Sequence, residues 1–159
     1  MLAKKFSLDE VDKKIIELVQ KNPQMTHTTI AKKVDRSQPT VGLRIRRLKD
    51  SGLLQFQAGT NVTKSDDQLA KVEIRTNAPE KFEKIIRNCP FMVHGFRLTG
   101  DYNFSIIIIG SSVKELNDVI EIHFRKDPDV DLVRMNLITN YINDLILPVD
   151  LDQKKCKFI

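Results

Sequence analysis

The first fifty positions repeat apolar residues at the spacing of α-helices. Five of them recur every three or four positions and predict a helix that buries one face: Leu8, Val11, Ile15, Leu18 and Val19. Ser7 followed by Glu10 is a capping-box pattern at the start of this helix. Asn22 and Pro23 mark its end, because proline cannot continue a helix.

Two further helices follow closely. The segment MTHTTIAKKV predicts a short helix that Thr26 caps and that turns three residues inward: Ile30, Ala31 and Val34. Asp35–Arg36 is a tight connector to a third helix. Ser37 caps that helix, Pro39 occupies its first turn, and three residues form its buried stripe: Val41, Ile45 and Leu48. Ser51–Gly52 ends it.

Two short strands are predicted after the third helix. Residues 53–59 (LLQFQAG) and 60–64 (TNVTK) have the composition of a β-hairpin, with Gly59 near its turn. Three helices and a small hairpin form the plan of a winged helix-turn-helix domain, in which the second and third helices are the helix-turn-helix itself. We assign this domain to residues 1–63 and the polar segment 64–68 to a linker.

The second half of the chain combines strands with two amphipathic helices. Alternating or continuous apolar positions predict four strands: residues 69–76, 92–100, 104–110 and 129–142. Helical spacing predicts two helices: residues 78–89 and 112–124. The order β-α-β-β-α-β is the ferredoxin-like split βαβ arrangement. The predicted fold class is therefore α+β, with this second domain over residues 69–148 and a tail over 149–159.

The strand FSIIIIG, residues 104–110, is apolar on both faces. A ferredoxin-like domain covers only one sheet face with helices, so the other face needs a second cover. Residues 130–138 also carry apolar side chains on both faces. A second subunit is the simplest cover, and we therefore expect a homodimer through this domain.

The positive charge is concentrated in the first domain. Residues 1–63 hold 12 Lys and Arg against 6 Asp and Glu, a net charge of +6, whereas the remainder holds 14 against 15, a net charge of −1. A basic excess confined to one segment favours an anionic partner, of which nucleic acid is the commonest. A basic, solvated surface is the alternative that charge alone leaves open.

Neither secretion nor membrane insertion is indicated. The segment MLAKKFSLDE lacks the apolar core of a secretory signal, and the longest purely apolar run, Ile106–Ile109, is far shorter than a membrane span. We expect a cytoplasmic protein without membrane contact. Cys89 and Cys156 lie far apart without metal or redox spacing. The three histidines, His27, His94 and His123, are scattered as well. We therefore expect no metal and no cofactor.

The outward face of the third helix suits contact with DNA. With the apolar stripe turned inward, Gly42 lies on the opposite face, where a bare backbone can approach another surface closely. The N-terminal part of a recognition helix meets base edges, and guanidinium groups reach phosphates or guanine. We therefore expect nine DNA contacts: Arg36, Ser37, Gln38, Thr40, Gly42, Leu43, Arg44, Arg46 and Arg47. The competing interpretation is a solvated amphipathic helix that happens to contain a glycine.

Individual side chains have specific expected partners on the DNA. Arg46 is the expected bidentate contact to guanine, and Gln38 suits adenine. Leu43 is apolar and outward, which suits a thymine methyl group. Arg36 and Arg47 are the expected phosphate contacts.

Both halves of the chain resemble the Lrp/AsnC (feast/famine) transcription regulators. The resemblance spans residues 8–148 and rests on four segments: LDEVDKKIIELVQKN, TTIAKKV, SQPTVGLRIRRLKDSGLLQ and LTGDYNFSIIIIG. A helix-turn-helix paired with a βαββαβ domain of the RAM (ACT-like) type, with a G-x-Y-[DN] turn, is more specific than either part alone. The resemblance implies sequence-specific binding of double-stranded DNA by dimers, or by tetramers and octamers built from dimers. It also implies a small effector, usually an amino acid, bound at subunit interfaces.

The resemblance places the effector pocket at the turn TGDYN, whose five residues are the expected contacts: Thr99, Gly100, Asp101, Tyr102 and Asn103. Gly100 can adopt a positive φ and present backbone N–H groups to a carboxylate. Tyr102 offers an aromatic wall, and Asp101 or Asn103 would meet an ammonium group. The family turn usually ends in aspartate, and the amide of Asn103 is weaker at that task. A plain hairpin turn is the alternative.

Two functions of other classes stay open beside regulation. Sirohaem decarboxylases are similar to this family and carry a degenerate helix-turn-helix, but the third helix of this chain is intact and basic. A ligand-sensing adaptor would use its helix-turn-helix only for protein contacts, and salt-dependent DNA binding would separate it from a regulator. No nucleophile–base pair or phosphate loop is evident, so we expect a regulator and not an enzyme.

Overall fold

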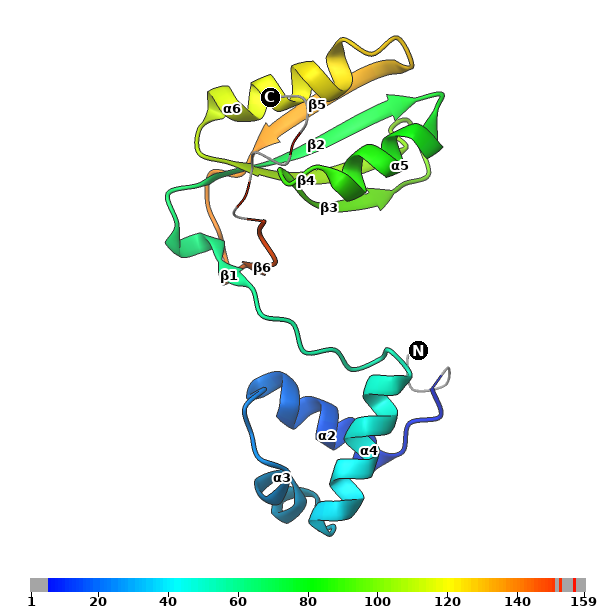
Figure 1. Cartoon of the computed structure of the whole chain (residues 1–159), viewed down its shortest axis with the longest axis vertical. Coiled ribbons are helices and arrows are strands. Elements are labelled where there is room, and N and C mark those ends of the chain that lie inside the picture. Colours follow the sequence, from blue (N-terminus) through cyan, green and yellow to red (C-terminus); the bar gives the residue numbers. More distant parts are fainter. Residues whose placement is uncertain (1–5, 151, 153–155, 157–159) are drawn as a thin grey trace. The chain divides into compact units, whose positions relative to one another are not determined.

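A computed structural model describes residues 6–150, 152 and 156 of the chain (Figure 1). The chain forms two compact units, of which the first ends at Gln57 and the second begins at Ala58. Among the described residues, the first unit contains three α-helices and the second contains two antiparallel sheets and two α-helices, so the predicted α+β class is confirmed. Within the described residues, no helix has the length and apolar character needed to cross a bilayer.

The first unit is built from α2 (Glu10–Lys21), α3 (His27–Val34) and α4 (Gln38–Asp50). Each helix turns its predicted apolar stripe into one shared core, which Leu54 closes from the following loop: Ile15, Val19, Ile30, Ala31, Val34, Val41, Ile45, Leu48 and Leu54. The helical period therefore fixed the buried face of all three helices.

Local hydrogen bonds set the start of each helix. Thr26 and Ser37 are the N-caps of α3 and α4, as predicted. The predicted cap at Ser7 is wrong, because Asp9 caps α2 and exchanges reciprocal bonds with Asp12 in a capping box. Ser7 has φ 49° and lies in the left-handed region, whereas a cap residue needs an extended backbone.

The predicted β-hairpin after α4 does not form in the described structure. Residues 53–59 contain no strand, and β1 (Thr60–Asn61) pairs with β6 (Ile146–Leu147) in the second unit. A Cβ added at Gly59 would lie 2.9 Å from the Leu147 carbonyl oxygen, so this glycine permits close backbone contact rather than a hairpin turn. The assigned domain boundary at residue 63 and the linker that follows it therefore lie inside the second unit.

The sheet of the second unit has the strand order β3-β4-β2-β5 and is antiparallel throughout. Its strands and helices follow the predicted βαββαβ order: β2 (Gln68–Thr76), α5 (Pro79–Asn88), β3 (Met92–Arg97), β4 (Phe104–Gly110), α6 (Val113–Ile120) and β5 (Val130–Leu137). The strand predicted to reach residue 142 ends earlier. There Asn140 accepts a hydrogen bond from the N–H of Tyr141, a local bond that competes with strand pairing.

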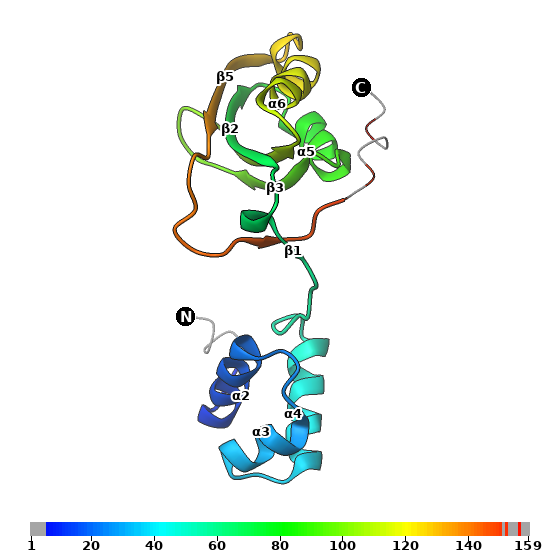
Figure 2. The same ribbon diagram turned by 90° about the vertical axis from the view of Figure 1, so that its left-hand side faces the viewer.

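Helices α5 and α6 lie on the same face of the sheet (Figures 1 and 2). They bury it in a core that includes Phe82, Phe124 and the inward residues of β4, Phe104, Ile106 and Ile108. After α6 the chain continues in a π-helical turn, Glu121–Arg125, instead of more α-helix.

The opposite face of the sheet is covered in part by the chain itself. Leu69 and Ile109 are buried there beneath Val62 and Leu147, with Tyr141 and neighbouring residues packed around them. A second subunit was the expected cover for this whole face, and for this end of the sheet that expectation is wrong. The chain reaches it because β6 returns to pair with β1.

Candidate nucleic-acid interface and effector turn

The predicted DNA contacts on α4 are of two kinds: within the described chain, some side chains are exposed and unpaired, and others form ion pairs inside the unit. Leu43 is 66% exposed, and Arg46 is exposed beside it. Among the described residues Arg46 has no hydrogen-bond or ion-pair partner. Gln38 and Gly42 lie on the same side, and these residues line a shallow groove of about 600 Å³ together with His27, Pro39 and Lys49.

Arg44 and Arg47, two further predicted contacts, form ion pairs inside the unit. The guanidinium of Arg44 lies 2.6 Å from an oxygen of Asp9 and 2.8 Å from Asp12, and Arg47 also pairs with Asp12. The pairing with two carboxylates raises the pKa of Arg44 further above its usual range. Both arginines therefore connect α4 to the start of α2.

Asp12 is the centre of this network. Its side chain is 1% exposed, and it accepts from the Asp9 backbone N–H as well as from both arginines. A carboxylate buried to this degree needs such partners, because its desolvation is otherwise too costly. Arg44, itself only 24% exposed, is therefore part of the scaffold that holds α4 in place.

Packing inside the unit does not require a glycine at position 42 of α4. A Cβ added there would meet the His27 ring at 3.5 Å, which is ordinary van der Waals contact. The fold would therefore accept alanine at this position and gain helix propensity. The glycine instead leaves the backbone open on the groove side, next to Leu43 and Arg46.

Two of the predicted DNA contacts, Ser37 and Thr40, form the N-terminal cap of α4. Ser37 accepts a hydrogen bond from the Thr40 N–H, and the two hydroxyl groups lie 2.8 Å apart. In the connector, Asp35 has φ 51°, a left-handed conformation that glycine adopts more readily than other residues. Arg36 is exposed and donates to the Asp35 carbonyl oxygen.

The turn predicted to bind an effector is held by Asn103. Its side-chain amide donates to the Thr76 carbonyl oxygen at 2.6 Å, and its side-chain oxygen accepts from the Thr76 N–H at 3.0 Å. An amide satisfies both groups at once, and an aspartate would lack the donor. Asn103 therefore ties the turn to β2, and its polar atoms are already engaged.

The other residues of the turn are exposed to solvent or half-buried. Gly100 has φ 123°, which confirms the expected positive φ. Thr99 and Asp101 are exposed, and Tyr102 is half-buried with the Arg134 guanidinium 5.0 Å from its ring centre. Cation–π contact of this kind fixes the ring against the sheet.

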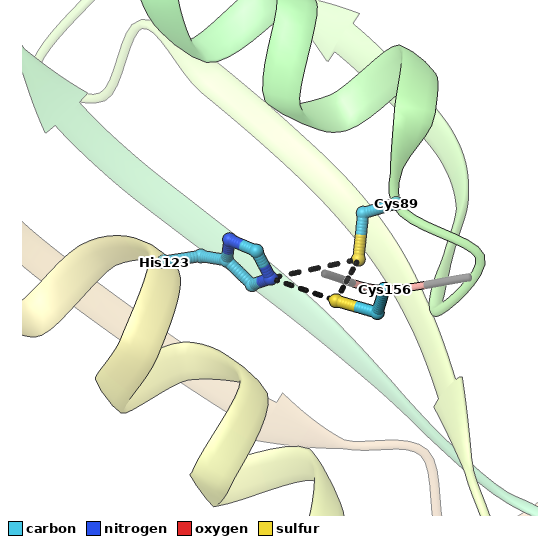
Figure 3. Close-up of side chains that lie close together, drawn as sticks. All are labelled: Cys89, His123 and Cys156. Atoms are coloured by element: carbon cyan, nitrogen blue, oxygen red, sulfur yellow. Dashed lines mark hydrogen bonds between the residues drawn. The ribbon is translucent and has the colours of Figure 1, made fainter. Parts of the chain in front are cut away.

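A third group of side chains consists of residues that are far apart in the sequence and close together in the fold. Cys89, His123 and Cys156 are all buried, and their sulfur and nitrogen atoms lie within 4.8 Å of one another (Figure 3). Burial raises the pKa of the Cys89 thiol to about 12 and lowers the pKa of His123. No spacing rule finds such a group, because its members lie 34 and 33 residues apart.

Comparison with known proteins accounts for both units. A family described as winged helix-turn-helix DNA-binding matches residues 8–55, and the Lrp/AsnC ligand binding domain matches residues 69–144. The HTH-type transcriptional regulator FL11 of Pyrococcus furiosus is 32% identical over 119 residues, which cover 72% of this chain and 78% of that protein.

Solved structures show the same fold. The AsnC structure from E. coli superposes with a TM-score of 0.75 at 16% identity and covers 86% of this chain and 95% of that one. The regulator NMB0573 of Neisseria meningitidis, solved as an L-Met complex, gives a TM-score of 0.71 at 22% identity, over 86% and 92% of the two chains. Because both halves match in the same order, the chain belongs to the Lrp/AsnC family and is a DNA-binding transcription regulator of that type.

Proposed function

We propose that this regulator reads DNA with the groove side of α4 and acts in the cytoplasm without catalysing a reaction. The observation that carries the proposal is the unpaired, exposed Arg46 beside the bare backbone of Gly42 and the outward Leu43. Gln38 at the start of the helix lies where a recognition helix meets base edges. All of the net positive charge of the chain lies in the same unit.

Under this proposal, seven of the nine expected contacts meet DNA directly and two act indirectly. Gln38, Gly42, Leu43 and Arg46 face bases, and Arg36 reaches a phosphate from the connector. Ser37 and Thr40 present the capped N-terminus of α4, whose N–H groups favour an anion. Arg44 and Arg47 act through Asp12 by holding the helix, so their effect on DNA binding is indirect.

Substitution of Arg46 tests the base-facing assignment. Arg46→Ala should weaken binding by about 1–3 kcal/mol on a duplex that the wild-type protein selects from random sequence, if Arg46 contacts guanine bidentately. Arg87→Ala on α5 removes the same charge from an exposed position of the second unit and should leave affinity unchanged. Fluorescence anisotropy over a salt series measures both. Wild-type affinity in folded Arg46→Ala would refute the assignment.

We propose that the protein functions as a homodimer, or as a tetramer or octamer built from dimers. The support is the part of the outer sheet face that the chain leaves open, where Phe96 is 47% exposed and Leu132 is 42% exposed. In the register row of Phe96 the neighbouring strands carry Ser105, Glu73 and Arg134. Apolar side chains left exposed beside charged ones on a sheet face suit a second copy of the same surface.

Light scattering on the full chain tests the dimer. Phe96→Glu should shift the protein toward monomer, because a charge would be buried at the interface. Val113→Glu places the same side chain in the first turn of α6, on the helix side of the sheet, and should leave the assembly unchanged. A Phe96→Glu variant that assembles like the wild type would rule out this face.

We propose that an amino acid binds at the turn 99–103 where a neighbouring subunit completes the pocket. Gly100 offers a backbone N–H to the ligand carboxylate, Tyr102 a wall, and Asp101 a charge for the ammonium. Asn103 supports the turn rather than the ligand. A structure-related regulator carries L-Met in its solved complex, and an amino acid is the ligand class that we therefore test first.

Isothermal titration of the common amino acids tests the pocket. Asp101→Asn should weaken whichever ligand binds, and Asp66→Asn, an exposed aspartate elsewhere in the same unit, should not. A protein that binds none of them, or whose affinity does not change in Asp101→Asn, would contradict the proposed site.

A further inference from the structure

We propose that Cys89, His123 and Cys156 form a binding site for a single zinc ion in the second unit. The three ligand atoms are the two Sγ atoms and Nε2 of the imidazole. Figure 3 shows the imidazole directed with Nε2 toward both sulfur atoms. The Cys2His set is a ligand combination that zinc sites use, with a fourth position left for water or another ligand.

The distances fit tetrahedral coordination. Zinc bonds of about 2.3 Å to sulfur and about 2.0–2.1 Å to nitrogen at tetrahedral angles separate two sulfur atoms by about 3.8 Å, and sulfur from nitrogen by about 3.6 Å. The two Sγ atoms lie 3.8 Å apart. Nε2 lies 3.7 Å from Sγ of Cys89 and 3.3 Å from Sγ of Cys156. A tetrahedral zinc ion just off the plane of these three atoms requires the ligand atoms to move by only a few tenths of an ångström.

The charge balance of the site also favours zinc. Binding releases one proton from each thiol to solvent, and the two thiolates then balance the charge of Zn²⁺, with a neutral imidazole as third ligand. A neutral complex is the form that a buried site tolerates, and all three residues are buried. Cu(I) with the same ligands would leave a net negative charge in this interior.

Each ligand comes from a different part of the fold. Cys89 ends α5, His123 lies in the π-helical turn after α6, and Cys156 lies near the end of the chain. Single π-helical turns are frequent at functional sites, because the extra residue redirects a side chain. Zinc would therefore join both helices that cover the sheet to the C-terminal segment, and so stabilise this part of the effector-binding unit.

A disulfide between Cys89 and Cys156 is the competing use of the two sulfur atoms. The sulfur–sulfur distance of 3.8 Å would have to fall to about 2.05 Å, and an external oxidant would have to accept two electrons. That reaction gives no role to His123, whose ring nitrogen lies near both sulfur atoms. Zinc accounts for all three residues, and the test below separates the two uses.

The test uses the full chain, treated with a chelator under reducing conditions and then titrated with metal. One Co²⁺ ion should bind per chain. Its absorption spectrum should show the bands of a tetrahedral site together with thiolate-to-cobalt charge transfer. Zn²⁺ should displace it, and competition against a chromophoric chelator gives its affinity.

Single substitutions locate the site. Cys156→Ser and His123→Gln should each weaken Zn²⁺ binding by at least about 100-fold, more than the loss of an outer-shell partner costs. His94→Gln, at an exposed histidine in β3, should bind like the wild type. Cys156 lies outside the helices and strands of the described chain, so Cys156→Ser retains the fold if circular dichroism is unchanged.

Three results would overturn the proposal. One is the absence of thiolate-to-cobalt absorption in the reduced protein. Another is Zn²⁺ affinity that Cys156→Ser does not change. The third is a reduced protein that binds no metal and forms the Cys89–Cys156 disulfide with oxidised glutathione, which would identify a redox pair instead.

Discussion

Gly42→Ala separates what the fold needs from what the DNA-reading face needs. The added methyl group would meet the His27 ring at 3.5 Å and 3.9 Å, so it fits beside α3 without displacing it. The position lies in the interior of α4, where alanine is about 1 kcal/mol better than glycine. In a domain of about this size, such a gain raises the melting temperature by about 4–8 °C.

The same methyl group should weaken DNA binding. It projects into the groove that Leu43 and Arg46 line, at the place where we propose that the backbone meets the duplex. Forcing an extra methyl group into a close-packed contact costs about 1–3 kcal/mol, which corresponds to a dissociation constant raised about 5- to 150-fold. A more stable protein that binds DNA less tightly is therefore the expected outcome.

Two measurements on the full chain check this prediction. Hydrogen exchange of the α4 amides reports the stability of the first unit, and anisotropy with the selected duplex reports affinity. Gly52→Ala is the control, because φ 72° makes alanine strained there while nothing lies within 4 Å of the new Cβ. It should lose stability and keep its affinity. Gly42→Ala that binds DNA as tightly as the wild type would refute the proposed groove contact, and a loss of stability would refute the packing argument.

Three further substitutions test the tertiary contacts. Asp12→Ala should destabilise the first unit by about 1–3 kcal/mol in denaturant titration, because it leaves Arg44 with Asp9 as its one carboxylate and the Asp9 N–H without its acceptor; a change below 1 kcal/mol, on the order of a surface pair, would show that the network is solvated. Asn103→Asp should destabilise the second unit by about 1–3 kcal/mol, since it removes the donor to the Thr76 carbonyl oxygen, and unchanged unfolding would disprove that bond. Gly59→Ala should break the pairing of β1 with β6, because its Cβ would lie 2.8 Å from Ile146; faster exchange of the Val62 amide, which donates to the Leu145 carbonyl oxygen, is the expected readout, and protection like that of the wild type would contradict it.

Features that depend on close neighbours in the chain were predictable from the sequence. The stripe of α4, its cap at Ser37 and the end of α2 at Asn22 depend on residues within about one helical turn. The βαββαβ order was predictable for the same reason, because each strand and helix carries its own period. The family resemblance and the DNA-binding class rested on these local patterns.

The roles of individual side chains depended on residues far along the chain. Periodicity placed both Arg44 and Arg46 outside the core stripe, but only the folded unit puts Arg44 against Asp12, 32 residues earlier. Even the cap of α2 was misplaced by two residues, because Ser7 and Asp9 both suit a cap and the backbone at Ser7 turned out to be left-handed.

Local patterns were sufficient to predict the three helices of the first unit, the βαββαβ order of the second, and the unit that carries the positive charge, but not the β1–β6 pair or the π-helical turn. Tertiary structure alone decided which strand pairs with Thr60–Asn61, and that Cys89, His123 and Cys156 meet. The physical reason is the separation along the chain of the residues that interact. Hydrogen-bonded caps and amphipathic periods are set by residues within a few positions, whereas ion pairs, strand partners and ligand clusters depend on how distant segments pack.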